Sequence, residues 1–166
     1  MPRSREGSPE KKITKAIIDL LVNVPMFDTL TSDELRIVTR HMNFIDLEKG
    51  ETLFKEGEKG DYVCFVVSGH LDVLKGAGGG NYVVLATLSK GRSIGEMAVI
   101  DNFPRSATVK AREKSTLVIL TRKGFDMILS QHPPVGVKIL KGIARLLSQN
   151  LRMTSSRLVD HLLPLS

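Results

Sequence analysis

The spacing of apolar residues divides the chain into a helical start, a long middle of short β-prone segments and a helical end. Ser8, Pro9 and the acidic residue that follows read as the cap and first turn of a helix. Its apolar residues then recur every three or four positions, as in an amphipathic helix: Ile13, Ala16, Ile17, Leu20 and Leu21. Pro25 marks its end. Thr31 and Glu34 form a capping-box pattern that predicts a second helix.

The middle of the chain changes to short β-prone runs that are separated by glycine-containing turns. The runs are FIDL, ETLF, YVCFVV, HLDVLK, YVVLATL, SATVKA and STLVIL. Many short strands with turn signals at a spacing of about 8–12 residues are typical of a sandwich or a jelly-roll barrel. The segment 77–81, AGGGN, is expected to form the flexible tip of a hairpin.

The helical period returns near residue 121 and predicts two further helices. The first starts at Thr121 or Arg122 and ends at Pro133-Pro134, and the second runs from about Val135 to His161. The apolar residues of the long helix approximate a 3.5-residue repeat: Leu140, Ile143, Leu147, Leu151, Leu158 and Leu162. This face either packs against the chain's own barrel or pairs with the same helix of a second copy, and we expect a homodimer through it.

These elements together predict a mainly β protein with flanking helices. Its centre would be an antiparallel β-roll or jelly-roll barrel, with helices before it and a long helix after it. The expected organisation is a flexible tail over residues 1–8, helices over 9–41, the β-roll over 42–121 and helices over 122–166. The last helices would serve as a lid and as the dimer helix.

Composition narrows the class of protein without naming a function. A length of 166 residues suits one domain, and 42% hydrophobic with 25% charged residues is ordinary for a globular protein. The single cysteine, Cys64, excludes an intramolecular disulfide and sits in an apolar run, so we expect a buried, inert thiol. We expect a cytoplasmic setting, because the apolar runs are too short to cross a bilayer and the N-terminus does not resemble a signal peptide.

Charge and histidine placement argue against two other classes of protein. The net charge of +6 would suit a nucleic-acid binder, but the basic residues are spread around helix surfaces. Aromatic residues are only 5% with no Trp, so no stacking platform is visible and nucleic acid is not an expected partner. A cupin-type metal enzyme would need clustered ligands, whereas the four histidines (His41, His70, His132 and His161) contain no His-x-His pair. We therefore expect no metal, no cofactor and no catalytic residues.

The segment 91–109, GRSIGEMAVIDNFPRSATV, carries the clearest chemistry. Arg105 offers a planar fork of donors that suits the paired oxygens of a phosphate. Gly95 allows the backbone to approach a ligand closely, and a helical turn over MAVI would aim its first N–H groups at the same anion. Ser106 would add a hydroxyl donor. Glu96 would repel a phosphate, so it makes sense only opposite a donor such as a ribose 2′-hydroxyl.

Each charged residue also has a plainer interpretation when it is taken alone. Arg105 would then be an exposed strand charge, or a partner of Glu96 or Asp101 in an ion pair. Glu96 would be a surface carboxylate that caps a helix. The order in which these residues occur together favours a ligand site.

The ordered set of residues resembles the cyclic nucleotide-binding domain found in catabolite activator proteins, protein kinase A regulatory subunits and cyclic nucleotide-gated channels. The resemblance runs from about Val24 to Ser156. It rests on Pro25-Met26-Phe27, Leu35, Gly50, Phe54, Gly57, Gly60, Asp61, Phe65, Gly69, Gly91, Gly95 to Ala98 and Arg105 to Ala107.

The resemblance implies a β-roll with a phosphate-binding cassette, and it implies roles for the cassette residues. Contacts to ribose and phosphate would come from Gly95, Glu96, Met97 and Ala98. Arg105 and Ser106 would hold the phosphate, and Ala107 would support the cassette backbone. Gly57, Gly60 and Gly69 match turn glycines of the family.

The sequence indicates less strongly which cyclic nucleotide binds and how binding is signalled. Ser106 favours cAMP over cGMP, since in this family a threonine at that position favours guanine. Asn150 and Thr154, four residues apart on the long helix, would reach the base or would simply be polar surface groups. Ile94 stands where the family often has an aromatic residue, and Arg92 where an acidic or small residue is common.

We therefore expect a cyclic nucleotide sensor that signals through its C-terminal helix to an unidentified partner protein. No helix-turn-helix pattern follows that helix, so direct DNA binding is not expected. The alternative is a degenerate scaffold of the same fold that binds no nucleotide.

Overall fold

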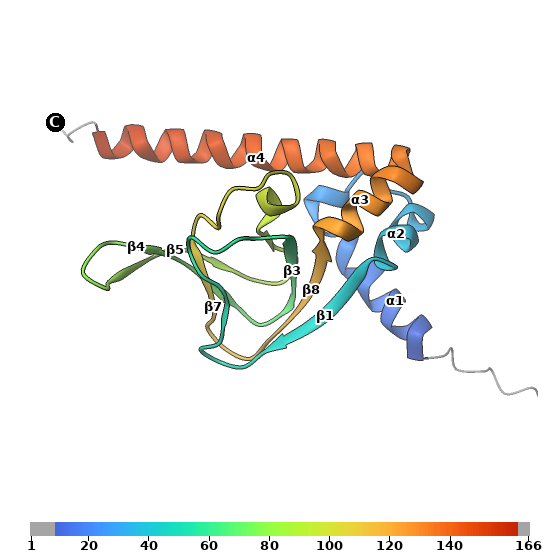
Figure 1. Cartoon of the computed structure of the whole chain (residues 1–166), viewed down its shortest axis with the longest axis horizontal. Helices are drawn as coiled ribbons and strands as arrows, with labels where there is room; N and C mark the ends of the chain where they lie inside the picture. The colour runs from blue at the N-terminus through green and yellow to red at the C-terminus, as the bar shows by residue number, and fades with distance from the viewer. Residues whose placement is uncertain (1–8, 163–166) are drawn as a thin grey trace, which may run out of the picture.

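Two antiparallel four-stranded sheets form the centre of the molecule in the computed structural model, which describes residues 9–162 (Figure 1). The strand orders are β1-β8-β3-β6 and β2-β7-β4-β5. The strands are β1 (Met42–Leu47), β2 (Thr52–Phe54), β3 (Tyr62–Ser68), β4 (Leu71–Gly76), β5 (Tyr82–Leu88), β6 (Ser93–Ile94), β7 (Thr108–Ala111) and β8 (Ser115–Thr121). The predicted mainly β fold with flanking helices is confirmed, and only the two-residue strand β6 had no sequence prediction.

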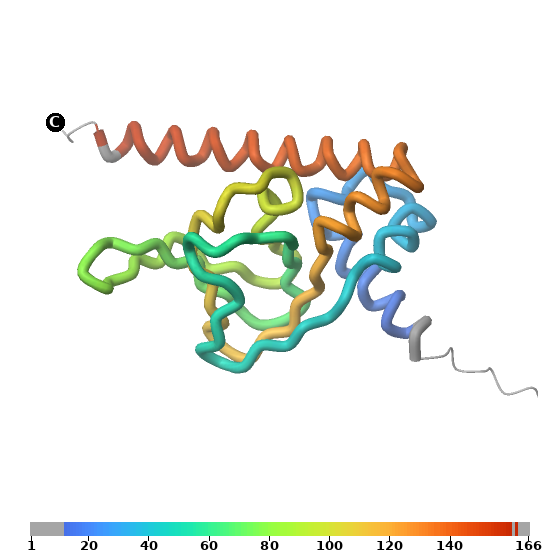
Figure 2. The backbone as a smooth tube through the Cα atoms, viewed as in Figure 1, coloured from blue at the N-terminus to red at the C-terminus, as the bar shows by residue number. Residues whose placement is uncertain are grey.

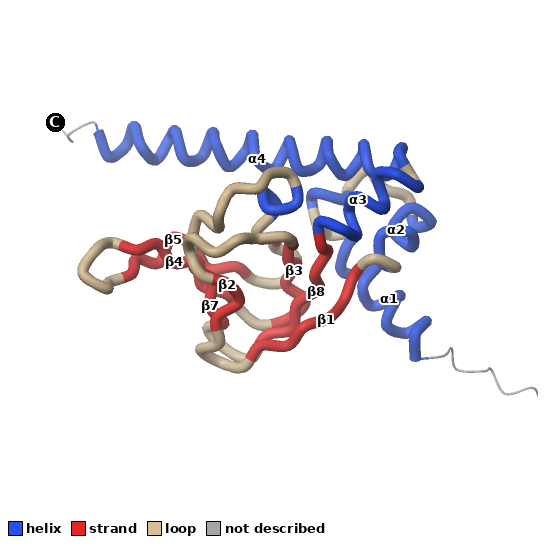
Figure 3. Tube along the Cα trace, in the orientation of Figure 1, coloured by secondary structure: helices blue, strands red, loops and turns tan. Residues whose placement is uncertain are grey.

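The helices gather beside one sheet, and the longest of them runs across the molecule (Figure 3). They are α1 (Pro9–Leu21), the 3-10 helix η1 (Pro25–Phe27), α2 (Ser32–Thr39), the 3-10 helix η2 (Glu96–Val99), α3 (Arg122–Gln131) and α4 (Pro133–Leu162). The predicted capping box is present, since Thr31 and Glu34 each bind the other's backbone N–H. Two prolines end α3 and begin α4, because proline lacks an N–H and is tolerated in a first helical turn.

Two apolar cores hold these layers together. The first lies between the helices and the β1-β8-β3-β6 sheet, where the rings of Phe27 and Phe65 have centroids 5.2 Å apart. The second lies inside the β-roll and includes Leu71, Val109 and Cys64. Burial raises the pKa of the Cys64 thiol to about 12, which confirms the expected inert thiol.

The N-terminal helix departs from its predicted extent and packing. It ends at Leu21 rather than continuing to Pro25. The core begins at Ile17, while Ala16 is exposed and Ile13 is 50% exposed. The apolar stripe is therefore partly a surface feature. The predicted tail over residues 1–8, with Ser8 as cap, lies outside the described residues.

The first half of α4 is fixed to the N-terminal helical elements. A Cβ at Gly142 would lie 2.1 Å from the carbonyl oxygen of Met26, so α4 and η1 touch backbone to backbone at this point. Arg145 also donates to both carboxylate oxygens of Asp28, at 2.7 and 3.1 Å. These contacts leave little room for the first half of α4 to slide over η1.

A second ion pair, further toward the start of α4, joins the helix to α2. The Lys138 ammonium lies 2.8 Å from both carboxylate oxygens of Glu34, the residue that completes the capping box. Hydrogen bonding to Lys138 lowers the pKa of the Glu34 carboxyl. The same glutamate therefore caps α2 and holds α4.

The leucine repeat of α4 divides into a packed part and an exposed part. Ile143 is buried and Leu147 is partly buried, and their neighbours belong to the helical core. Of the two alternatives for this face, packing on the barrel is not what the structure has, because the packed part of α4 lies against η1 and α3. The expected homodimer contact stays a prediction. Leu151, Leu158 and Leu162 are 58–69% exposed.

The hairpin of β4 and β5 extends away from the body of the molecule (Figure 2). Its predicted tip over 77–81 is confirmed as the connection, and Gly78, Gly79 and Gly80 all have positive φ. Tyr82 and the three residues after it are more than half exposed.

No helix among the described residues has the length and apolar character that a membrane crossing demands.

Candidate functional site

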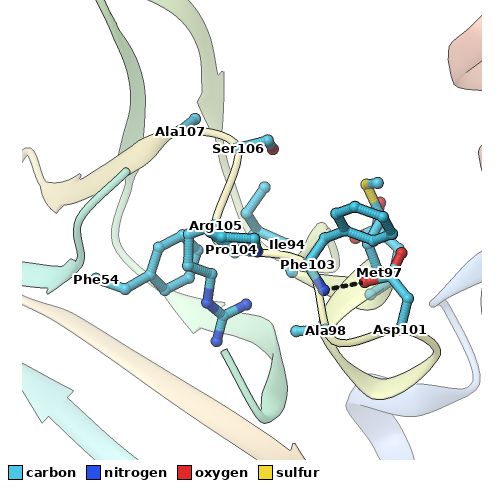
Figure 4. A pocket seen from close by; sticks show the side chains of 12 residues that line it. Phe54, Ile94, Met97, Ala98, Asp101, Phe103, Pro104, Arg105, Ser106 and Ala107 are labelled. Atoms are coloured by element: carbon cyan, nitrogen blue, oxygen red, sulfur yellow. Dashed lines mark hydrogen bonds between the residues drawn. The ribbon is translucent and has the colours of Figure 1, made fainter. Parts of the chain in front are cut away.

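A cavity of about 80 Å³ lies between the end of β2, the strand β6, the helix η2 and the loop that leads to β7 (Figure 4). The lining residues are Phe54, Ile94, Gly95, Glu96, Met97, Ala98, Asp101, Phe103, Pro104, Arg105, Ser106 and Ala107. The six residues that the resemblance assigned to ribose and phosphate are among them, as is Ala107, which was expected to support the cassette backbone. The residues of the cassette therefore line one common cavity.

Two glycines make room for the arginine of this site. Gly95 has φ +85° and caps η2, and a Cβ there would lie 2.4 Å from Nη1 of Arg105. A Cβ at Gly60 would lie 2.4 Å from Nε of the same side chain. Any larger residue at either position would displace the guanidinium.

The guanidinium of Arg105 is buried and only partly satisfied. The residue is 6% exposed, and its Nη2 donates to the Tyr62 carbonyl at 3.0 Å. Its Cζ lies 3.9 Å from the ring centroid of Phe54 and 4.6 Å from that of Tyr62. Nε and Nη1 have no hydrogen-bond partner, and neither Glu96 nor Asp101 accepts from them in the described part of the chain. The interpretations of Arg105 as a surface charge or an ion-pair partner are therefore wrong.

Glu96, the first residue of η2, is buried in the same cavity. It is 8% exposed, and its Oε2 has no hydrogen-bond partner. Burial raises the pKa of this carboxyl, while its own backbone N–H and the charge of Arg105 act in the opposite direction. The interpretation of Glu96 as a surface cap is wrong, because a surface carboxylate would be solvated.

A Glu96→Gln variant is expected to be more stable than the wild type at neutral pH. Because the pKa of Glu96 is raised in the folded state above its ordinary 4.5, the unfolded state loses the proton first as pH rises. The free energy of unfolding of the wild type then falls relative to that of the variant. Urea unfolding at about pH 4 and about pH 7.5 measures this difference, which should be larger at the higher pH. A difference that is the same at both pH values would contradict the prediction.

The loop after η2 is held by Arg122, a residue that sequence analysis did not assign to the site. Its guanidinium donates to the carbonyls of Ala98 and Asp101 and to the side chain of Asn102. Its backbone N–H donates to the Asp61 carbonyl at 2.6 Å. Because the partners are mostly carbonyl oxygens, no sequence pattern signals this contact.

Sequence analysis also missed three aromatic residues at the site. The rings of Phe54 and Tyr62 both contact the Arg105 guanidinium, and Phe103 lines the cavity. Phe54 was noted only as part of the resemblance. Tyr62 is 43 residues from Arg105 in the sequence and Phe54 is further away, so no local spacing signals these contacts.

The two proposed base contacts lie apart from the cavity. Neither Asn150 nor Thr154 lines it, and the Thr154 hydroxyl donates to the Asn150 carbonyl at 2.9 Å. Of the two departures from the family pattern, Ile94 lines the cavity. Arg92 is exposed and lines a different one, together with Lys90.

Comparison with known proteins decides the family. The sequence model described as "Cyclic nucleotide-binding domain" matches residues 44–132, which include the whole cavity. The chain belongs to this family.

Relatives of this cyclic nucleotide-binding domain include a protein kinase and a protein kinase regulatory subunit. The chain is 36% identical over 123 residues to a cGMP-dependent protein kinase of Plasmodium berghei, covering 72% of the chain and 14% of the kinase. It is 34% identical over 111 residues to a cAMP-dependent protein kinase regulatory subunit of Debaryomyces hansenii, covering 67% and 24%. The chain thus spans a quarter or less of the length of these relatives.

A solved structure shares nearly the whole architecture of the domain. It is a cyclic nucleotide-binding domain from Methylobacillus flagellatus, with 26% sequence identity and a TM-score of 0.81. The match covers 92% of this chain and 86% of that one. The likeness therefore extends beyond the β-roll into the flanking helices.

Proposed function

We propose that this domain is a regulatory sensor that binds cAMP in the cassette cavity. The observation that carries the proposal is the pair of opposite, buried and unsatisfied charges there. Glu96 Oε2 and two nitrogens of Arg105 lack partners although both residues are less than 9% exposed. Leaving buried charged groups without partners is costly, so a ligand that supplies both a donor and an anion would stabilise the site.

A cyclic nucleotide has both an anion for Arg105 and a hydroxyl donor for Glu96. Its phosphate carries one negative charge, which Arg105 would balance, with the Ser106 hydroxyl as a further donor. The N–H groups at the start of η2, which follows the left-handed turn at Gly95, would face the same anion. The carboxylate of Glu96 would accept from the ribose 2′-hydroxyl, and so favour ribose over deoxyribose.

Support for cAMP over cGMP comes from the residue after the arginine. Relatives of the chain include both a kinase named for cGMP and a regulatory subunit named for cAMP, so kinship alone leaves the base open. Ser106 stands where guanine-selective members carry threonine. Asn150 and Thr154 would contact the base only if α4 moved toward the cavity.

Our proposal for the output is a shift of α4 that a partner protein reads, without a catalytic step. Ligand changes the balance between two positions of α4 only to the extent that it binds one of them more tightly. The exposed leucines of α4, Leu151, Leu158 and Leu162, would form the contact between two copies.

Isothermal titration of the purified chain with cAMP, cGMP and 2′-deoxy-cAMP tests the proposal. The expected result is saturable binding, with affinity decreasing in the order cAMP, cGMP, 2′-deoxy-cAMP. Protein is first unfolded and refolded to remove any nucleotide that it carries from expression. Absence of heat with all three would favour the non-binding scaffold, in which the stack of Arg105 on Phe54 and Tyr62 is purely structural.

A further inference from the structure

Phe103 occupies an unusual position for a large apolar side chain. It is 75% exposed, the highest value of any large hydrophobic residue in the described part of the chain. It nevertheless lines the cassette cavity, as does Met97, which is 46% exposed. Single exposed hydrophobic residues are common on protein surfaces. This one stands at the entrance to the cavity that the proposed function assigns to a nucleotide.

The loop that carries Phe103 is held on both sides of the residue. The Phe103 N–H donates to Asp101 Oδ1 at 3.1 Å, and Arg122 binds the Asp101 carbonyl. On the other side, Pro104 pairs with Lys59 in an isolated β-bridge. The backbone therefore presents the ring at a defined place at the entrance.

The size of the cavity indicates what would lie against that ring. Its volume of about 80 Å³ is well below the roughly 300 Å³ at which ligand pockets usually begin. Glu96 and Arg105 are buried, so the sugar and the phosphate would fill the interior. The base would then remain at the entrance, where Figure 4 draws Phe103 away from the Arg105 guanidinium.

We propose that Phe103 is a ligand-binding residue that stacks on the purine of the bound nucleotide. This inference rests on the proposed function. An aromatic ring stacks on any purine face, so Phe103 adds affinity for a base without choosing between adenine and guanine. Ser106 would then remain the residue that separates cAMP from cGMP.

Titrations with and without a base on the ligand test the stacking directly. Phe103→Ala is expected to weaken cAMP binding by about tenfold, the usual size of one base–aromatic stack. It should leave binding of ribose 3′,5′-cyclic phosphate, which has no base, unchanged. Phe103→Tyr should bind cAMP like the wild type. Ile100→Ala is the matched control, because Ile100 is 47% exposed in the same loop but does not line the cavity.

Fluorescence gives a second readout that does not depend on affinity. The chain contains no Trp, so Phe103→Trp introduces a single reporter whose emission cAMP should quench by stacking. Ribose 3′,5′-cyclic phosphate should not quench it. Tyr82→Trp, on the distant hairpin strand β5, should respond to neither ligand.

Three results would overturn the inference. One is that the wild type binds cAMP and Phe103→Ala binds it with the same affinity, in which case the proposed function still stands. Another is quenching of the Phe103→Trp reporter by the ligand without a base. The third is a wild type that binds no cAMP, which overturns the stacking and the proposed function together.

Discussion

Replacing Arg105 with alanine is expected to weaken cAMP binding at least about 100-fold. Two charge-assisted hydrogen bonds to phosphate are each worth about 1.5–3 kcal/mol, and every 1.4 kcal/mol is about tenfold in affinity. The loss is large because the phosphate would lie beside buried side chains, where an unpaired charge is costly. Isothermal titration of Arg105→Ala against the wild type measures the loss.

The matched control for this variant is Arg92→Ala. It removes the same charge from an exposed side chain of the cassette that lines a different cavity, so general electrostatic attraction changes equally. Arg105→Lys keeps the charge but not the planar fork, and should bind with intermediate affinity. An Arg105→Ala affinity within about threefold of the wild type, which is less than 0.7 kcal/mol, would refute the role of Arg105 in holding phosphate.

Replacing Gly142 with alanine is expected to destabilise the fold by about 2 kcal/mol. The added Cβ would lie 2.1, 2.8 and 3.0 Å from the carbonyl oxygen, carbonyl carbon and Cα of Met26. Backbone cannot rotate away as a side-chain tip does, so α4 or η1 must shift. This strain exceeds the gain of about 1 kcal/mol that alanine usually brings to a helix. Urea unfolding followed by circular dichroism measures the change.

Ser148→Ala provides the comparison on the same helix. Ser148 is exposed on α4, and alanine there should leave stability unchanged or raise it slightly. If the Gly142→Ala variant has the same free energy of unfolding as the Ser148→Ala variant, α4 does not contact η1 as closely as the structure has it.

Local sequence signals predicted much of the fold because each depends on neighbouring residues. The capping box of Thr31 and Glu34 gave the start of α2, and the run AGGGN gave the hairpin between β4 and β5. By contrast, β6 holds only Ser93 and Ile94 and exists because they pair with β3. Two residues are too few to show the alternation of apolar and polar positions that predicts a strand.

The site was predictable to the extent that it is contiguous in sequence. Glu96 and Arg105 lie in one short segment, and the resemblance placed them together with the residues around them. Tyr62 and Arg122 approach the same segment from β3 and from the start of α3. Such contacts follow from the sheet topology, and a single sequence does not encode them at a readable spacing.

The long helix has a sharp change of surroundings along its length. Up to Leu147 it is held against η1, α2 and α3, and residues 151–160 are exposed along their whole length. The stretch from Leu147 to Leu162 is about 22 Å long at 1.5 Å per residue. With the contact between Gly142 and Met26 as its fixed point, the helix from Gly142 to Leu162 would form an arm about 30 Å long. A tilt of about 10° around Gly142 would carry the tip by about 5 Å.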